Sequence, residues 1–357
     1  MSKSQRLLSL DILRGLTVAG MILVNNGFGE SFYPLQHSKW NGMTPCDLVF
    51  PFFLFIMGVS TYLSLSKYNF RMTGEVVRKI IKRTVLLFLI GLFINWFHFA
   101  VKGELMCFDH LRIWAVLPRR ALCYGIVSVL ALTVNHRYIL HLVVFLLIGY
   151  GILLWFGNGY AQDSSNILAR VDNWLFGREH LYQKSPIDPE GLVGTISSVA
   201  HTLIGFYCGM MLKKAKNVDG KVSAFLLAGA ILVIGGYLLS FLLPLNKRIW
   251  SPSYVLMTCG LAALLQGILM YVIDVRGKKK WCTFFHVFGV NPLFLYASSE
   301  LLSIFLHHIG VSDWVYDRIH ALIPSLQWAS LAYAIYFVLL NFFLGYILFK
   351  RKIYIKL

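Results

Sequence analysis

A histidine and an aspartate stand just ahead of a long apolar run, within the segment from Gln36 to Pro51. His37 can gain or lose a proton near neutral pH, so it can serve as a general base or as an acyl carrier. Asp47 lies at the mouth of the apolar run, where a charge is unfavourable unless it is paired or faces a polar cavity. Alone, His37 would be an ordinary loop histidine. With Asp47, Trp40 and the Asn41-Gly42 turn, it predicts the rim of a reaction site.

Other polar residues stand close to the apolar runs. Arg112 and Arg119 precede one run, either as partners for carboxylates and phosphates or as interfacial anchors. Glu190 precedes another run, in a site or as a helix cap. Lys247 lies in a short link, where it binds an anionic group or anchors the link. Asn291 precedes a proline inside a run, and it either satisfies the freed backbone groups or serves the site.

The composition indicates a membrane protein. Charged residues make up 14% of the chain and apolar residues 57%, whereas soluble domains carry roughly 25% charged residues. We predict an all-α polytopic membrane protein that forms one domain over residues 1–357. One sizeable outward segment, 157–192, follows the fifth span and contains a short helix near 166–176. The ten predicted spans are 10–27, 46–66, 84–101, 119–135, 138–156, 193–212, 223–243, 252–273, 284–306 and 326–349.

The net charge of +17 follows the topology of these spans. If both termini are cytoplasmic, the inward links and tails hold 21 of the 33 lysine and arginine residues but only three acids. This asymmetry is the positive-inside rule, so we do not read the basic charge as a nucleic-acid site. The first span carries Asp11 and Arg14, a helical i,i+3 pair, and lacks the small-residue cleavage site of a signal peptide.

Several site classes lack their signatures in the sequence. There is no P-loop, GxGxxG fingerprint or serine nucleophile elbow. The six cysteines show no CxxC spacing, so we expect no metal. Cys46 and Cys107 are both predicted near the outer face; packed free thiols are the preferred interpretation, with a disulfide between them as the alternative.

Several sequence blocks resemble the heparan-alpha-glucosaminide N-acetyltransferase family. The blocks are Ser9–Gly15, Val24-Asn25, His37–Gly42, Asp47–Pro51, Phe55–Gly58, Arg112-Ile113, Leu117–Arg119, Asp188–Gly191, Pro244–Tyr254 and Gly289–Pro292. Pro118 and Arg120 depart from the family pattern, in which we expect a glutamine and an apolar residue. The chain looks like a bacterial, membrane-only member.

The resemblance implies that acetyl-CoA from the cytoplasm acetylates the amino group of a glucosamine-type sugar on the far side of the membrane. It places the active-site histidine on His37 and a supporting asparagine on Asn25. It also implies a multi-pass protein of the bacterial inner membrane, a periplasmic acceptor and a homodimer. Asp47 is expected to orient His37, and Asn25 to stabilise an oxyanion with the help of a nearby arginine.

The two substrates lead to further predictions. The acceptor site is predicted from residues near the outer face and in the ninth span: Trp40, Arg112, Arg119, Glu190, Lys247 and Asn291. The CoA phosphates are expected on inward basic residues: Arg78, Lys79, Lys82, Arg83, Lys278, Lys279 and Lys280. Two alternatives remain open at this point. One is an amino-sugar transporter that uses His37 and Asp47 as a proton relay, and the other is an O-acyltransferase for a surface polysaccharide.

Overall fold

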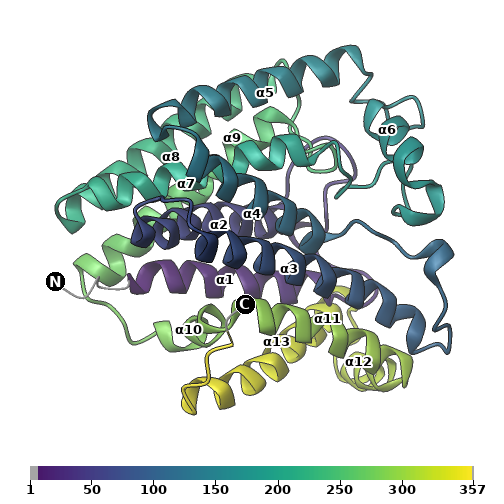
Figure 1. The fold of residues 1–357 in the computed structure, drawn as a ribbon. Coiled ribbons are helices and arrows are strands. Elements are labelled where there is room, and N and C mark those ends of the chain that lie inside the picture. Colours follow the sequence, from purple (N-terminus) through teal and green to yellow (C-terminus); the bar gives the residue numbers. More distant parts are fainter. Residues whose placement is uncertain (1–6, 356–357) are drawn as a thin grey trace.

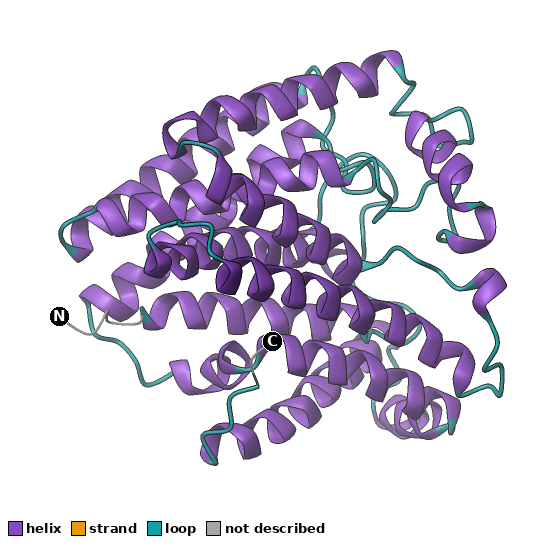
Figure 2. Cartoon of the chain, in the orientation of Figure 1, coloured by secondary structure: helices purple, strands orange, loops and turns teal. Residues whose placement is uncertain are grey.

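Helices form the whole framework of the protein. The computed structural model describes residues 7–355, in which all regular elements are helical (Figures 1 and 2). Nine helices in this range are long and apolar enough to cross a membrane. They are α1 (Leu8–Asn25), α2 (Val49–Leu65), α3 (Gly74–Ala100), α4 (Val116–Thr133), α5 (Ile139–Phe156), α7 (Thr195–Lys214), α8 (Val218–Ser240), α9 (Pro252–Leu269) and α13 (Leu326–Lys350). Each overlaps a predicted span, which confirms the all-α polytopic fold class.

The ninth predicted span is a broken helix. The segment 284–306 was predicted as one span in which Pro292 interrupts the backbone hydrogen bonds, and α10 (Cys282–Val290) and α11 (Pro292–His308) meet there at an angle of 85°. Pro292 cannot donate a backbone hydrogen bond, and Asn291 leaves helical geometry just before it. If the bent pair counts as one span, the described chain has ten.

Shorter helical elements lie between the spans. Helix α6 (Ile167–Phe176) confirms the helix expected near 166–176, whereas α12 (Val311–Leu322) was not predicted because acids and an arginine interrupt its apolar residues. The single-turn elements are η1 (Tyr33–Leu35), η2 (Pro45–Leu48), η3 (Ser66–Tyr68), η4 (Phe108–His110), η5 (His136–Tyr138), η6 (Arg178–His180) and the π-helical η7 (Met270–Val275).

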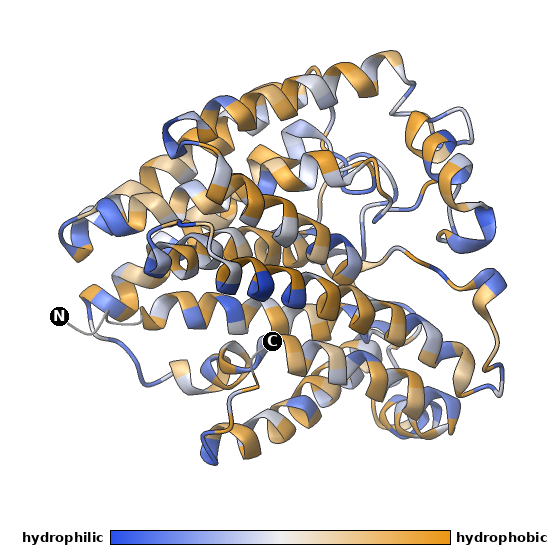
Figure 3. Cartoon of the chain, viewed as in Figure 1, coloured by the Kyte–Doolittle hydropathy of each residue, from blue (hydrophilic) through white to orange (hydrophobic). Residues whose placement is uncertain are grey.

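The centre of the bundle is a close pair of helices, α2 and α7. A Cβ atom at Gly58 would lie 2.1 Å from the Thr202 carbonyl oxygen, and one at Gly205 would lie 2.2 Å from that of Phe55. Glycines therefore let the two backbones touch, as small residues commonly do between membrane helices. Helices such as α3 and α5 lie farther out and carry apolar residues on their exposed faces (Figure 3).

The alternation of the helices gathers certain links at one end of the bundle. These links are 26–48, 101–115, 157–194 and 241–251, and they lie opposite the start of α1 and the end of α13 (Figure 1). These links contain six of the nine residues predicted for catalysis and acceptor binding. Asn25 ends α1 and Arg119 lies in the first turn of α4, so both lie next to the links, and Asn291 does not. We call this end of the molecule the site end. That it faces outward remains a prediction from the charge distribution.

Candidate active site

Local sequence fixes the position of Asp47. The turn η2 begins after Thr44, whose backbone N–H and hydroxyl donate to Asp47 Oδ2 over 3.1 and 3.2 Å. The Asp47 backbone N–H in turn bonds to the Thr44 side chain, and this reciprocal pair forms a capping box, which satisfies donors that a helix start leaves open. The backbone N–H of Ser38 adds a third hydrogen bond to Oδ2, at 3.1 Å. Asp47 is therefore rigidly held while its other oxygen remains available.

That second oxygen binds His37. Asp47 Oδ1 lies 2.8 Å from His37 Nδ1; the aspartate side chain is fully buried, whereas that of the histidine is 51% exposed. Because a carboxylate only accepts hydrogen bonds, the pairing favours the tautomer with a proton on Nδ1. Nε2 then carries the free lone pair. The structure thus supplies an oriented base at an accessible position.

A lysine from a distant link completes this group. Lys247 Nζ lies 2.9 Å from His37 Nδ1, 3.3 Å from Nε2 and 3.3 Å from Asp47 Oδ1. Cys46 Sγ also lies 3.1 Å from Nδ1. A ring nitrogen makes one strong in-plane hydrogen bond, and the buried carboxylate is the strongest partner available for it. Lys247 therefore lies against the ring and pairs with Asp47.

The link that carries Lys247 is tied to the His37 loop by two contacts. Gly42 N–H donates to the Leu245 carbonyl over 2.7 Å, and Asn246 Nδ2 donates to Asn41 Oδ1 over 3.1 Å. The Asn41-Gly42 turn, which the sequence marked as a tight turn, thus serves as the docking point for residues 241–251.

A second charged group surrounds Arg112. Its guanidinium binds Asp188 through Nε at 3.2 Å and Nη2 at 2.7 Å, and Glu190 through Nη2 at 2.7 Å. Burial disfavours the charged form of this arginine, but the two acids outweigh it and raise the pKa of Arg112. Burial alone would raise the pKa of Glu190; Arg112, Arg119 and Lys247 lower it overall. Since Lys247 acts on Glu190, the two charged groups are electrostatic neighbours.

Arg119 is fully buried next to this group. Its Nη2 donates to the Gly191 carbonyl over 2.7 Å and its guanidinium lies 5.5 Å from the Trp250 ring, while Nε and Nη1 have no hydrogen-bond partner. Asp172, on α6, lies beside Gly191, and burial raises its pKa to about 6 although Arg119 opposes the shift. Asp172 was not among the residues predicted from the sequence. The pattern that could have identified it is an acid one helical turn after Leu168, on the buried face of the expected helix.

Three predicted residues lie outside the His37 group. Asn25 Nδ2 donates to Glu300 Oε1 on α11 over 2.9 Å. Trp40 is buried and donates its N–H to the Tyr160 carbonyl over 3.1 Å, so it anchors the loop beneath the site. Asn291 lies near the opposite end, and its role differs from the one expected at the helix break. Instead of satisfying the freed helix groups, it bonds to the backbone of Ile353 and Ile355.

Most of the inward basic residues point away from the bundle. Six of the seven predicted CoA contacts are exposed: Arg78, Lys79, Lys82, Lys278, Lys279 and Lys280. Lys79 is bound by Glu75 at 2.5 Å and by the Tyr68 hydroxyl at 2.8 Å. Arg83 is the exception, because it is half-buried with its guanidinium 4.6 Å from the Tyr124 ring.

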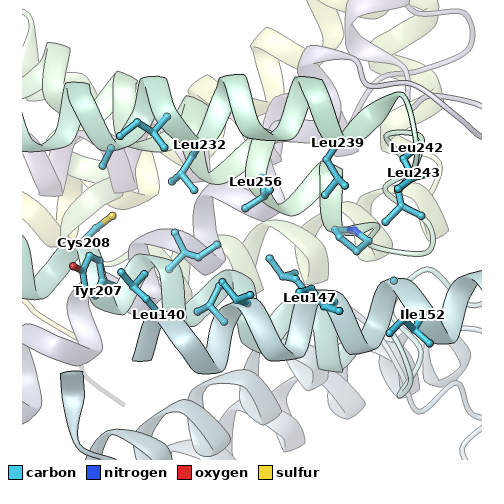
Figure 4. A pocket seen from close by; sticks show the side chains of 18 of the residues that line it. Leu140, Leu147, Ile152, Tyr207, Cys208, Leu232, Leu239, Leu242, Leu243 and Leu256 are labelled. Atoms are coloured by element: carbon cyan, nitrogen blue, oxygen red, sulfur yellow. The ribbon is translucent and has the colours of Figure 1, made fainter. Parts of the chain in front are cut away.

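A large cavity lies away from all of these residues. It has a volume of about 1000 Å³ between α5, α7, α8 and α9, and side chains such as Leu147, Leu232 and Leu256 line it (Figure 4). Its lining is almost entirely apolar, which suits lipid chains and not a nucleotide. All six cysteines are buried and free. Within residues 7–355 no cluster of three or more histidine, cysteine or acidic side chains has the geometry to hold a metal ion.

The fold and the site define a multi-pass membrane protein with a histidine–aspartate–lysine group at one end. A family model described as heparan-alpha-glucosaminide N-acetyltransferase, catalytic, matches residues 6–243. The chain therefore belongs to this acetyltransferase family, as its sequence blocks predicted.

Two animal proteins show the same relationship. The heparan-alpha-glucosaminide N-acetyltransferase of Mus musculus is 28% identical over 400 residues, which cover 94% of this chain and 60% of the mouse protein. That of Homo sapiens is 28% identical over 398 residues, covering 93% of this chain and 59% of the human protein. The chain thus spans about 60% of the length of these relatives.

Proposed function

We propose that this protein transfers the acetyl group of acetyl-CoA to the amino group of a glucosamine-type sugar at the site end of the bundle. The observation that carries the proposal is the pair of His37 and buried Asp47, in a chain that belongs to the acetyltransferase family. The pair supplies the base that this reaction needs. On the predicted topology, acetyl-CoA enters from the cytoplasm and the sugar from the periplasm.

His37 has two tasks in direct transfer. Its Nε2 takes a proton from the sugar ammonium, which leaves a neutral amine that attacks the thioester carbonyl. When the tetrahedral intermediate collapses, the carbon–sulfur bond breaks, the imidazolium returns a proton to the CoA thiolate, and the attacking nitrogen releases its second proton to solvent. The products are the amide, the CoA thiol and one proton. Asp47 stabilises the imidazolium between these steps and keeps the ring oriented.

The charges around His37 match the needs of this reaction. The ammonium of Lys247 lies 3.3 Å from Nε2, close enough to stabilise the oxyanion that forms on the acetyl carbonyl. Asn25 is the second candidate donor for this oxyanion. Glu190 is one of the two carboxylates that Arg112 binds, and a carboxylate can form a charged hydrogen bond with the ammonium of an amino sugar. Arg119 would support the Arg112 group through the Gly191 backbone.

The same histidine can carry the acetyl group itself. In that mechanism Nε2 attacks the thioester, CoA leaves, and the sugar amine then attacks the acetyl-imidazole. Incubation with acetyl-CoA but no sugar distinguishes the two mechanisms. A covalent acetyl group on a His37 peptide, found by mass spectrometry and absent from His37→Gln, indicates the carrier mechanism. Its absence, with transfer intact, indicates direct attack.

The central experiment uses the purified protein in detergent with acetyl-CoA and glucosamine. We expect free CoA thiol and N-acetylglucosamine to appear in equal amounts. A transporter would instead move labelled sugar across sealed vesicles without consuming acetyl-CoA. An O-acyltransferase would acetylate a hydroxyl, which product mass spectrometry and base lability identify. Either outcome without N-acetylation would refute the proposal.

A further inference from the structure

Two arginines inside the bundle have no anionic partner among residues 7–355. Arg120, on α4, is only 6% exposed, and its Nε and Nη1 atoms have no hydrogen-bond partner in this part of the chain. Arg83, on α3, has a buried Nε that is likewise without a partner among the described residues. Each guanidinium instead faces an aromatic ring: that of Arg120 lies 3.8 Å from the centroid of Phe53, and that of Arg83 lies 4.6 Å from the centroid of Tyr124.

The aromatic rings do not balance the burial of these charges. A cation–π contact recovers only a small part of the free energy that an ion loses when it is removed from water. The surrounding charges add to this cost, because Arg83 and Arg14 both act on Arg120 with the same sign. Asp11, the acid on α1, already binds Arg14 at 2.8 Å. An anion from outside the chain would supply the missing charge.

The two arginines lie at intermediate depth. Arg83 follows the start of α3 by nine residues, or about 14 Å of helix. Arg120 follows the start of α4 by four residues, or about 6 Å, and α4 begins at the site end, where α3 finishes. Gly91 packs against Pro118 and Gly125 against Thr84, so α3 and α4 run side by side in opposite directions. Arg83 and Arg120 therefore lie nearer to opposite ends of the bundle. Exposed Arg78 and Lys82 precede Arg83 on α3, on the side where α1 begins.

We propose that Arg83 and Arg120 form a binding site inside the bundle for the diphosphate of the acetyl-CoA donor. The assignment rests on the proposed function, because that function supplies the ligand. Two guanidinium groups match a group that carries one negative charge on each of its two phosphates. A diphosphate held at this depth also shortens the distance that the pantetheine arm must span to His37. From the bundle interior, the arm crosses only part of the ~30 Å core.

The experiment measures binding to the full-length purified protein, with transfer assayed separately. The ligands are acetyl-CoA, its dephospho form, which lacks the 3′-phosphate but keeps the diphosphate, and S-acetylpantetheine, which lacks both. Arg120→Leu and Arg83→Met should each raise the dissociation constants of both nucleotides about 10- to 100-fold, the loss typical of a charged hydrogen bond. Affinity for S-acetylpantetheine should stay within about twofold of the parent value. Arg137→Leu, at an exposed arginine on the end of the bundle where α1 begins, is the control.

A stability measurement separates ligand binding from a structural role. Without ligand, Arg120→Leu should unfold at the same temperature as the parent or higher, because it removes an unpaired buried charge. If this variant does not fold, Arg120→Gln takes its place in the same assays. Unchanged nucleotide affinity, equal losses for all three ligands, or a loss confined to the ligand with a 3′-phosphate would each overturn the assignment. Arginine-dependent binding without transfer would instead refute only the proposed function.

Discussion

The protein holds its buried charges in two different ways. At the site end, His37, Asp47 and Lys247 lie within hydrogen-bond distance of one another, and Asp47 accepts from three further donors. Deeper in the bundle, Arg83 and Arg120 face aromatic rings. The first group is complete without a ligand, and the second is not.

This difference indicates what each group does. A complete network keeps its members in one geometry, which a general base requires before the substrate arrives. An incomplete cationic pair raises the free energy of the empty protein and lowers that of the complex. On the two proposals, the residues around His37 are held in one geometry before the substrates bind, whereas Arg83 and Arg120 gain an anionic partner only when the ligand enters.

The largest expected effect comes from the complete group. His37→Ala should lower the rate of acetyl transfer by about 10²- to 10⁴-fold, the usual contribution of a general base, and leave acetyl-CoA affinity nearly unchanged. Transfer rates and equilibrium binding are measured on the same preparation. His110→Ala is the matched control, because His110 is a half-exposed loop histidine at the same end. Near-normal turnover in His37→Ala would remove the catalytic assignment.

Asp47→Asn tests whether the network is complete. An amide can donate where the carboxylate accepted, so the ring loses its preferred tautomer and the rate should fall about 100-fold or more. The variant should also lose about 3 kcal/mol or more of stability, as expected when one partner of a buried charge pair is removed. Thermal unfolding in detergent compares it with Arg120→Leu, for which no loss is expected. Equal stability changes in the two variants would erase the distinction between the groups.

Lys247→Met should lower the rate of acetyl transfer. The ammonium lies 3.3 Å from His37 Nε2, where it can stabilise the oxyanion that forms on the acetyl carbonyl. Loss of one such donor should lower kcat about 100-fold. The values of kcat and KM for acetyl-CoA, measured on parent and variant at one pH, provide the test. An unchanged kcat with a raised KM would assign Lys247 only to substrate binding.

The smallest effect concerns stability alone. Burial raises the pKa of Asp172 to about 6 from an ordinary value of 3.8, so the folded protein binds this proton more tightly than the unfolded chain. Its contribution to stability is therefore highest below pH 4 and falls, by at most about 3 kcal/mol, as the pH rises to about 6. In Asp172→Asn this decline should be absent. Parallel unfolding temperatures for parent and variant between pH 4.5 and 7.5 would contradict the prediction.

Much of the fold and part of the site could be predicted from the sequence. Nine predicted spans overlap single helices, because an apolar run of bilayer length has no alternative structure in a membrane. The ninth span, 284–306, was predicted as one span with Pro292 inside it. Pro292 marked the break, but the 85° bend depends on how α10 packs against α1 and how the C-terminal segment holds Asn291.

The sequence alone determined what is local. Thr44 and Asp47 form their capping box across one helical turn, and His37 stands close enough along the chain to reach the carboxylate they position. Only the tertiary structure decided the rest. Lys247 comes from a link more than two hundred residues away, and no pattern in the sequence states which links will share one end of the bundle at hydrogen-bond distance. The depth of Arg83 and Arg120, and the rings they face, likewise follow from helix packing, since sequence fixes a residue's place along a helix but not the neighbour that covers it.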